Sequence, residues 1–230
     1  MKKVLNNIFI EGFSGMAIGI FPTLIIGLIL TQIASLIGGR VGELLLIIGK
    51  IASSLTGAGI GIGIAVKFKS SFYMTGASAV TGLIGGFASQ ILAGKLLVNG
   101  SIILTGAGEP LGAFIAAFVG IQFGKLVSEK TKIDLLLTPA VVILTGASIG
   151  LLAGPPISGL MTLLGSVINW SVEQQPIIMG IMVSLIMGAT LTGPLSSAAL
   201  SIILNLSGLA AGAATVRVCS KYDRFCSCKF

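Results

Sequence analysis

The stretch that decides the fold is LTGAGEPLGAFIAAFVGIQFGKLV, which runs from Leu104 to Val127. It is almost wholly apolar, yet it carries a carboxylate, Glu109, directly before Pro110. Proline suits the first turn of a helix, where its missing N–H is not needed. We therefore expect a helix to begin at Pro110, with Gly106 and Gly108 before it and Glu109 at its positive end.

The rest of the chain is equally apolar. Of its 230 residues, 54% are hydrophobic and only 9% are charged, and the mean hydropathy is +1.08. Soluble domains carry about 25% charged residues. The 33 glycines also suit closely packed membrane helices. The composition predicts an all-α integral membrane protein.

The composition also excludes several kinds of chemistry. The chain has no histidine, so catalysis by histidine and phosphate carried on histidine are excluded. All three cysteines lie in the last twelve residues, which leaves the body of the chain without a disulfide framework or a zinc site. We expect no catalytic residue, no metal and no cofactor. The net charge of +7 does not come from a basic stripe with interleaved aromatic residues, which is typical of nucleic-acid binding. We therefore expect no nucleic-acid partner.

The apolar runs predict about seven transmembrane helices, since a span needs ~20 mostly apolar residues. The predicted spans are residues 13–38, 44–66, 72–93, 102–127, 133–152, 177–193 and 195–214. Residues 1–12 are expected to form a short interfacial helix, and Pro22 to kink the first span. Gly154-Pro155-Pro156 should end the fifth span, which leaves 157–170 as an interfacial or re-entrant segment.

The lysines indicate an orientation. With the N-terminus inside, the three loops on the cytoplasmic side hold Lys2, Lys3, Lys67, Lys69, Lys125, Lys130 and Lys132. The first two external loops hold only Arg40 and Lys95. This asymmetry follows the positive-inside rule and predicts a cytoplasmic N-terminus.

Few polar groups are expected at membrane depth, and Glu109 is the leading site candidate. An ionisable group at a helix centre in lipid costs ~2.5–3.5 kcal/mol, which is tolerated where it faces a polar cavity or a partner. Helix starts preceded by glycines form substrate sites in many transporters. We therefore expect Gly106, Gly108, Glu109 and Pro110 to bind a sugar-like solute; the alternative is that Glu109 caps a helix at the interface.

Two further candidates are weaker. Glu173, Gln174 and Gln175 offer adjacent carboxylate and amide groups for hydroxyl recognition, although a solvated loop explains them equally well. Asn205 lies within a predicted span, where it can bind the solute or hydrogen-bond to another helix. The motif LTGAG at 55–59 and 104–108 indicates either an internal duplication or the ordinary use of small residues in packed helices.

The character of the chain changes after residue 216. Residues 217–230 contain all the cysteines and four basic residues. Codons can be chosen for residues 217–230 such that the same bases, read in a frame shifted by one base, encode an apolar segment. That segment would continue the preceding helix. We therefore divide the chain into a transmembrane domain, 1–216, and a tail, 217–230. The tail is interpreted as the result of a frameshift that truncates a longer membrane protein; the alternative is a genuine basic tail that meets anionic lipid, which a seventh span leaving the cytoplasm argues against.

The segments GAGEPLGAFIAAFVGIQFGKLV, KTKIDLLLTPAVVILTGASIGLLAGPPI, QQPIIMGIMVSLIMG and LSGLAAGAATV resemble the small EIIC-like permeases of the bacterial phosphoenolpyruvate-dependent sugar phosphotransferase system. The likeness covers most of residues 10–216. It implies a multi-pass permease of the bacterial plasma membrane that takes up a sugar while cytoplasmic EIIA and EIIB proteins supply phosphotransfer. Unlike well-studied sugar permeases of that system, this chain has no histidine.

Three functions remain open at this point. The first is a permease subunit that lies in the lipid bilayer and takes up a sugar or related small polar solute. A homodimer is one assembly that such a subunit could form. The second is a membrane sensor that kept the permease fold without phosphotransfer, which the missing histidine suits. The third is an intramembrane enzyme. The predicted spans offer no Ser/His, Asp/Asp or metal-ligand set for such an enzyme.

Overall fold

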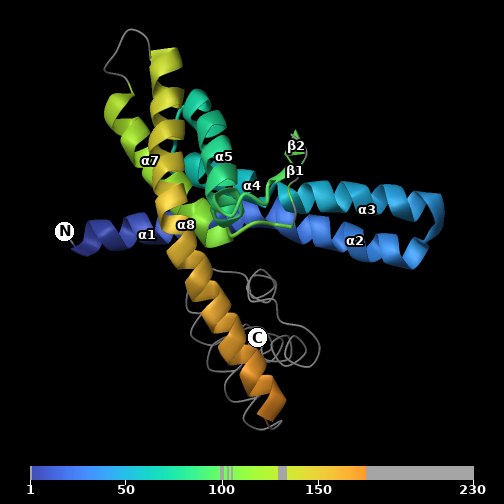
Figure 1. The fold of residues 1–230 in the computed structure, drawn as a ribbon. Coiled ribbons are helices and arrows are strands. Elements are labelled where there is room, and N and C mark those ends of the chain that lie inside the picture. The colour runs from blue at the N-terminus through green and yellow to red at the C-terminus, as the bar shows by residue number, and fades with distance from the viewer. Residues whose placement is uncertain (1, 99–100, 103, 105, 129–133, 175–230) are drawn as a thin grey trace, which may run out of the picture. The chain divides into compact units, whose positions relative to one another are not determined.

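The computed structural model describes residues 2–98, 101–102, 104, 106–128 and 134–174, and they are almost entirely helical (Figure 1). The chain divides into two compact units, residues 1–158 and 159–230. The fold class predicted from composition is confirmed. The only strands in the described part are β1 (Leu97–Val98) and β2 (Ser101–Ile102), which pair antiparallel with Val98 opposite Ser101.

The first span begins earlier than predicted. α1 (Lys2–Ile20), the π-helical turn η1 (Phe21–Ile25) and α2 (Ile26–Ile37) follow one another without a break, so residues 1–12 are not a separate interfacial helix. Glu11–Ile37 is long and apolar enough to cross a membrane, as predicted. Pro22 lies in the first turn of η1, where the wider π turn accommodates its missing N–H.

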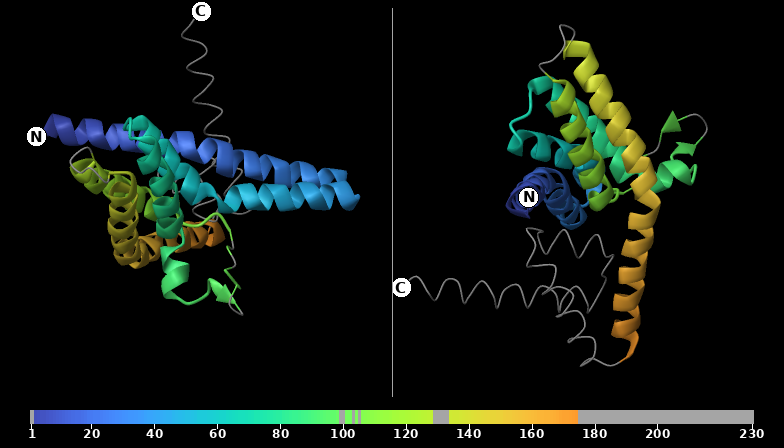
Figure 2. Two further views of the ribbon diagram at one scale, coloured as in Figure 1. Left: turned by 90° about the horizontal axis from the view of Figure 1, so that it is seen from above. Right: turned by 90° about the vertical axis from the view of Figure 1, so that its left-hand side faces the viewer.

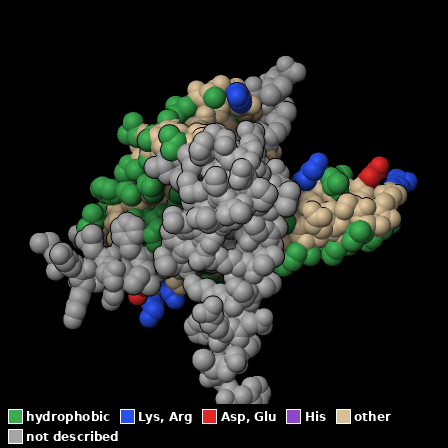
Figure 3. Space-filling view, turned by 90° about the horizontal axis from the view of Figure 1, so that it is seen from below, with side chains coloured by type: hydrophobic (Ala, Val, Ile, Leu, Met, Phe, Trp, Pro, Cys, Tyr) green, Lys and Arg blue, Asp and Glu red, His purple; other side chains and the backbone are tan. Residues whose placement is uncertain are grey.

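α2 turns back into α3 (Gly39–Ser54), and the two helices form an antiparallel hairpin (Figures 1 and 2). The turn depends on Gly38 and Gly39, both with a φ of +64°, a conformation that costs other residues about 1–2 kcal/mol. Most large apolar side chains of this hairpin are exposed, as expected for a surface that faces lipid. Figure 3 shows hydrophobic side chains along the hairpin and charged ones at its far end.

The second predicted span, 44–66, is not one straight helix. α3 ends at Ser54, and α4 (Thr56–Lys67) continues at an angle of 50°. Leu55 lies between them with φ −84° and ψ 8°, outside the helical region, and the hydroxyl of Thr56 donates to the carbonyl oxygen of Ser53 at 2.5 Å. The bend directs the glycine-rich α4 into the core, whereas a straight helix would have continued along α3.

The third predicted span, 72–93, is also broken. α5 (Phe72–Gly86) is capped by Phe87, and only the short α6 (Ala88–Leu92) follows. The fourth, 102–127, is helical only from Pro110: α7 is Pro110–Val127. The third span breaks where two adjacent glycines, Gly85-Gly86, lie at the end of α5. The start of α7 at Pro110, after Gly106 and Gly108, is as predicted.

The core of this unit is formed by backbones in close contact. A Cβ added to Gly57 of α4 would lie 2.7 Å from the carbonyl oxygen of Gly82 in α5, and one on Gly112 of α7 would lie 2.5 Å from that of Gly85. On the last helix, a Cβ on Gly150 would meet Gly85 and Ala116. Small residues therefore bring α4, α5, α7 and the start of α8 together, as is typical of membrane helices.

α8 (Asp134–Gln174) is a single helix of 41 residues with Pro139, Pro155 and Pro156 inside it. The prediction that Gly154-Pro155-Pro156 would end the fifth span was wrong, and so was the separate segment at 157–170. Membrane helices tolerate internal prolines because neighbouring groups and local adjustments satisfy the freed carbonyls. Within this helix, Leu135–Gly159 is long and apolar enough to span a bilayer.

Within the described ranges, three helices have the length and composition of a membrane span, or four if the bent pair α3 and α4 counts as one. The predicted spans 177–193 and 195–214 lie outside the described residues, as does the division between 1–216 and 217–230. The expectation of broken helical segments is confirmed by the α3–α4 pair.

Candidate solute site

The start of α7 has the geometry that the sequence predicts. Pro110 occupies the first turn and is buried, and Glu109 is the N-cap residue with φ −99° and ψ 106°. The carboxylate of Glu109 makes no capping hydrogen bond to the helix that follows. The alternative prediction, that Glu109 caps a helix start at the interface, stays open, because Glu109 is the N-cap residue by its backbone although its side chain makes no capping bond.

The two glycines before Glu109 determine the path of the backbone that leads into it. Gly106 and Gly108 have φ values of +83° and +69°, both in the left-handed region. Gly108 also lies against the end of α5, because a Cβ there would come within 2.8 Å of the carbonyl oxygen of Gly86. The next N–H, that of Glu109, donates to this same oxygen at 2.6 Å. The loop is thereby fixed to the break between α5 and α6.

The side chain of Glu109 is half-buried, and its two oxygens differ. Oε1 accepts a hydrogen bond of 2.8 Å from the hydroxyl of Ser89 in α6. Oε2 is buried and has no hydrogen-bond partner among the residues described. A buried acceptor without a partner costs about 1–3 kcal/mol, more when it is charged. Within the described residues, this leaves one acceptor of Glu109 without a partner.

This arrangement suits a neutral solute that carries hydroxyl groups. A hydroxyl can donate a hydrogen bond to Oε2. A hydrogen bond to a carboxylate is about twice as strong as one between neutral groups. In the described ranges no group of three or more His, Cys, Asp or Glu side chains is placed to hold a metal ion.

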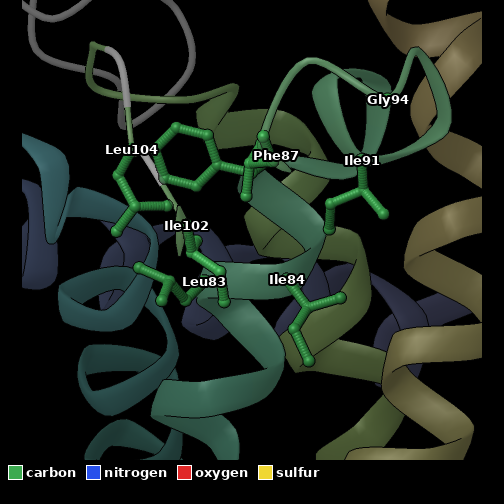
Figure 4. Close-up of a pocket in the computed structure, with 8 residues that line it drawn as sticks. Leu83, Ile84, Phe87, Ile91, Gly94, Ile102 and Leu104 are labelled. Carbon is green, nitrogen blue, oxygen red and sulfur yellow. The ribbon is translucent and has the colours of Figure 1, made fainter. Parts of the chain in front are cut away.

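A separate apolar pocket of about 330 Å³ has Phe87 in its lining (Figure 4). Its walls come from α5, α6 and the segment around β2, and it is lined by Leu83, Ile84, Phe87, Ile91, Gly94, Leu96, Ile102 and Leu104. Glu109 is not part of this lining. The side chains of the pocket offer no hydrogen-bonding group, so its chemistry does not suit a polyol, and the Glu109 region remains the polar candidate.

The remaining predicted site residues are not brought to Glu109 by the described structure. Glu173 and Gln174 are the last two residues of α8 and belong to the second unit. Gln175 and Asn205 lie outside the described residues. The roles predicted for these four residues stay predictions.

Sequence analysis missed Ser89 and the carbonyl of Gly86. Both lie within residues 72–93, which were expected to form one uninterrupted span, and Ser89 is twenty residues from its partner. The signal that pointed to them was the Gly85-Gly86 pair, since adjacent glycines in an apolar run mark a place where a helix can break.

The opposite end of α7 carries positive charge. Lys125 lies in its last turn, where its ammonium donates to the carbonyl oxygen of Phe68 at 2.8 Å and lies 5.0 Å from the centre of the Phe68 ring. The negative Glu109 at the N-terminus and the positive Lys125 near the C-terminus both match the helix dipole. An 18-residue helix is about 27 Å long, so the two charges are separated by most of the hydrocarbon thickness of a bilayer.

The sequence matches the family described as "Phosphotransferase system, EIIC" over residues 10–227. The chain belongs to this EIIC family. No curated protein and no solved structure matches it. The resemblance seen in the sequence is confirmed.

Family membership and the apolar helices together establish the class of this EIIC protein. It is a multi-pass protein of the bacterial plasma membrane and a sugar-permease component of the phosphotransferase system. The family gives neither the identity of the solute nor the residues that bind it.

Proposed function

We propose that this EIIC protein takes up a neutral sugar or polyol and that Glu109 binds a hydroxyl of the solute. The observation that carries the proposal is the buried Oε2 of Glu109, which has no partner in the described part of the chain. A solute hydroxyl would supply the missing donor. The broken helices around the residue support the same role, because discontinuous helices form the substrate sites of many transporters.

Phosphotransfer is assigned in this proposal to separate cytoplasmic EIIA and EIIB proteins. The chain has no histidine, so it has no phosphohistidine of its own. Its part would be to hold the solute while an EIIB protein delivers the phosphoryl group from the cytoplasmic side. The N-terminus and the loop containing Lys67 and Lys69 are placed on that side by the positive-inside rule.

Uptake by whole cells tests the proposal. Cells that express the protein with EIIA and EIIB proteins are given radiolabelled D-glucose, D-mannitol and N-acetyl-D-glucosamine, and uptake is compared with that of cells without it. Glu109→Gln keeps the size of the side chain and removes its charge, and we expect it to lower the uptake of the transported solute about tenfold or more. Glu43→Gln, at an exposed position of α3, is the matched control and should leave uptake unchanged.

A Glu109→Gln variant that transports as well as the unaltered protein, at equal abundance in the membrane, would overturn the assignment of Glu109. Retention of uptake in cells without any EIIA or EIIB protein would overturn the assignment of phosphotransfer to those partners.

A further inference from the structure

The hydroxyl of Ser89 bonds to a group on another element, as the hydroxyl of Ser78 in α5 also does toward the carbonyl oxygen of Gly61 in α4. Ser35, Ser53 and Ser54 each donate to a carbonyl oxygen one turn earlier in their own helix. This is the usual partner of a serine within a helix. Ser89 instead donates to the carboxylate of Glu109, twenty residues away on another element.

The backbone beside Ser89 is also bonded to Glu109. The carbonyl oxygen three residues before Ser89, that of Gly86, accepts the N–H of Glu109 at 2.6 Å. The turn from Gly86 to Ser89 holds Glu109 at two points, its backbone N–H and its Oε1.

Two points of attachment fix the direction of the carboxylate. A glutamate side chain normally loses considerable rotamer freedom when it binds a ligand, and this loss weakens binding. Here Oε1 is bonded before any solute arrives, and Oε2 is left buried and unpartnered within the described structure. Such advance orientation by a neighbouring hydrogen bond is how binding groups are usually held in their productive geometry.

We propose that Ser89 is a positioning residue: its hydroxyl holds Oε1 of Glu109 so that Oε2 accepts the solute hydroxyl. Ser89 does not touch the solute. This inference rests on the proposed role of Glu109, and the experiment below separates the two.

Solute binding and uptake are measured on the full-length protein with radiolabelled D-glucose, D-mannitol and N-acetyl-D-glucosamine, in detergent and in cells. Ser89→Ala should raise the Kd and the KM of the bound solute about tenfold, as expected for the loss of one hydrogen bond to a charged group, and leave the maximal rate unchanged. Ser89→Thr keeps the hydroxyl and should restore the affinity to within about threefold. Ser54→Ala, whose hydroxyl bonds only to its own helix in the described contacts, is the matched control and should have no effect.

A double-mutant comparison shows whether Ser89 acts through Glu109. Adding Ser89→Ala to Glu109→Gln should weaken binding no further than Glu109→Gln alone, because the oriented carboxylate is already lost. A purely structural serine would instead add its own loss in both backgrounds and would lower the melting temperature.

The outcomes distinguish the two proposals. If Glu109→Gln weakens binding and Ser89→Ala does not, or if the two effects add, the positioning role is wrong while the role of Glu109 stands. If Glu109→Gln leaves binding intact, or if the unaltered protein binds none of the three solutes, the proposed function itself is wrong and the role of Ser89 falls with it.

Discussion

Gly108 lies so close to Gly86 that a Cβ on Gly108 would come within 2.8 Å of the Gly86 carbonyl oxygen. The same oxygen accepts the N–H of Glu109 at 2.6 Å. The end of α5 and the start of α7 are thus joined where the candidate carboxylate begins, and any side chain at Gly108 would push the two apart.

Gly108→Ala should therefore destabilise the protein and impair uptake. At the φ of +69° that Gly108 adopts, an alanine is destabilised by about 1–2 kcal/mol. The close contact with Gly86 adds to this loss of stability. Gly106→Ala is the matched control, because Gly106 has a similar φ of +83° but no atom within 4 Å of its Cβ position. The melting temperature in detergent should fall more for Gly108→Ala; equal losses would show that the Gly86 contact is unimportant.

Two glycines of α5 should respond in opposite directions to alanine. Gly85→Ala would place its Cβ 2.6 Å from the carbonyl oxygen of Gly112 and should separate α5 from α7, at a cost of about 1–3 kcal/mol. Gly76 has open space around its Cβ position, so Gly76→Ala should be neutral or stabilise by about 0.4–1 kcal/mol. Thermal unfolding of both variants checks this, and a stable Gly85→Ala would contradict the close approach of the two helices.

Lys125 should contribute modestly to stability through Phe68. Its ammonium contacts both the carbonyl and the ring of Phe68, but the side chain is exposed, so Lys125→Gln should cost only about 0.5–1 kcal/mol. Lys67→Gln removes an exposed charge nearby and serves as the control. The difference between the two variants should shrink in high salt, where exposed charges are screened. No difference at low salt would show that the contact contributes nothing.

The predicted orientation places position 40 outside and position 69 inside the cell. Arg40→Cys and Lys69→Cys, each in a chain whose native Cys219, Cys226 and Cys228 are changed to serine, can be labelled with a membrane-impermeant maleimide. Intact cells should label only the first variant, and permeabilised cells both. The reverse pattern would invert the topology and would place the loop with Lys67 and Lys69 away from the cytoplasmic partners.

Features with a local cause were predictable from the sequence. The membrane class follows from a chain with only 9% charged residues, and the helix start at Pro110 follows from the missing N–H of proline. The positive φ of Gly106 and Gly108 agrees with the expectation that the backbone opens before Glu109. Each of these depends on single residues or on neighbours within about one turn, which the sequence displays directly.

Features that depend on distant contacts were decided only by the tertiary structure. α8 continues through Pro155 and Pro156, although prolines commonly end helices in water. Membrane helices tolerate such prolines where other groups satisfy the freed carbonyls. The meeting of Ser89 with Glu109 requires α5 to break at Phe87 and the chain to return through β1 and β2 before α7 begins. The sequence alone does not predict which residues twenty positions apart will be in contact. The packing of α5, α6 and α7 brings the serine to the carboxylate.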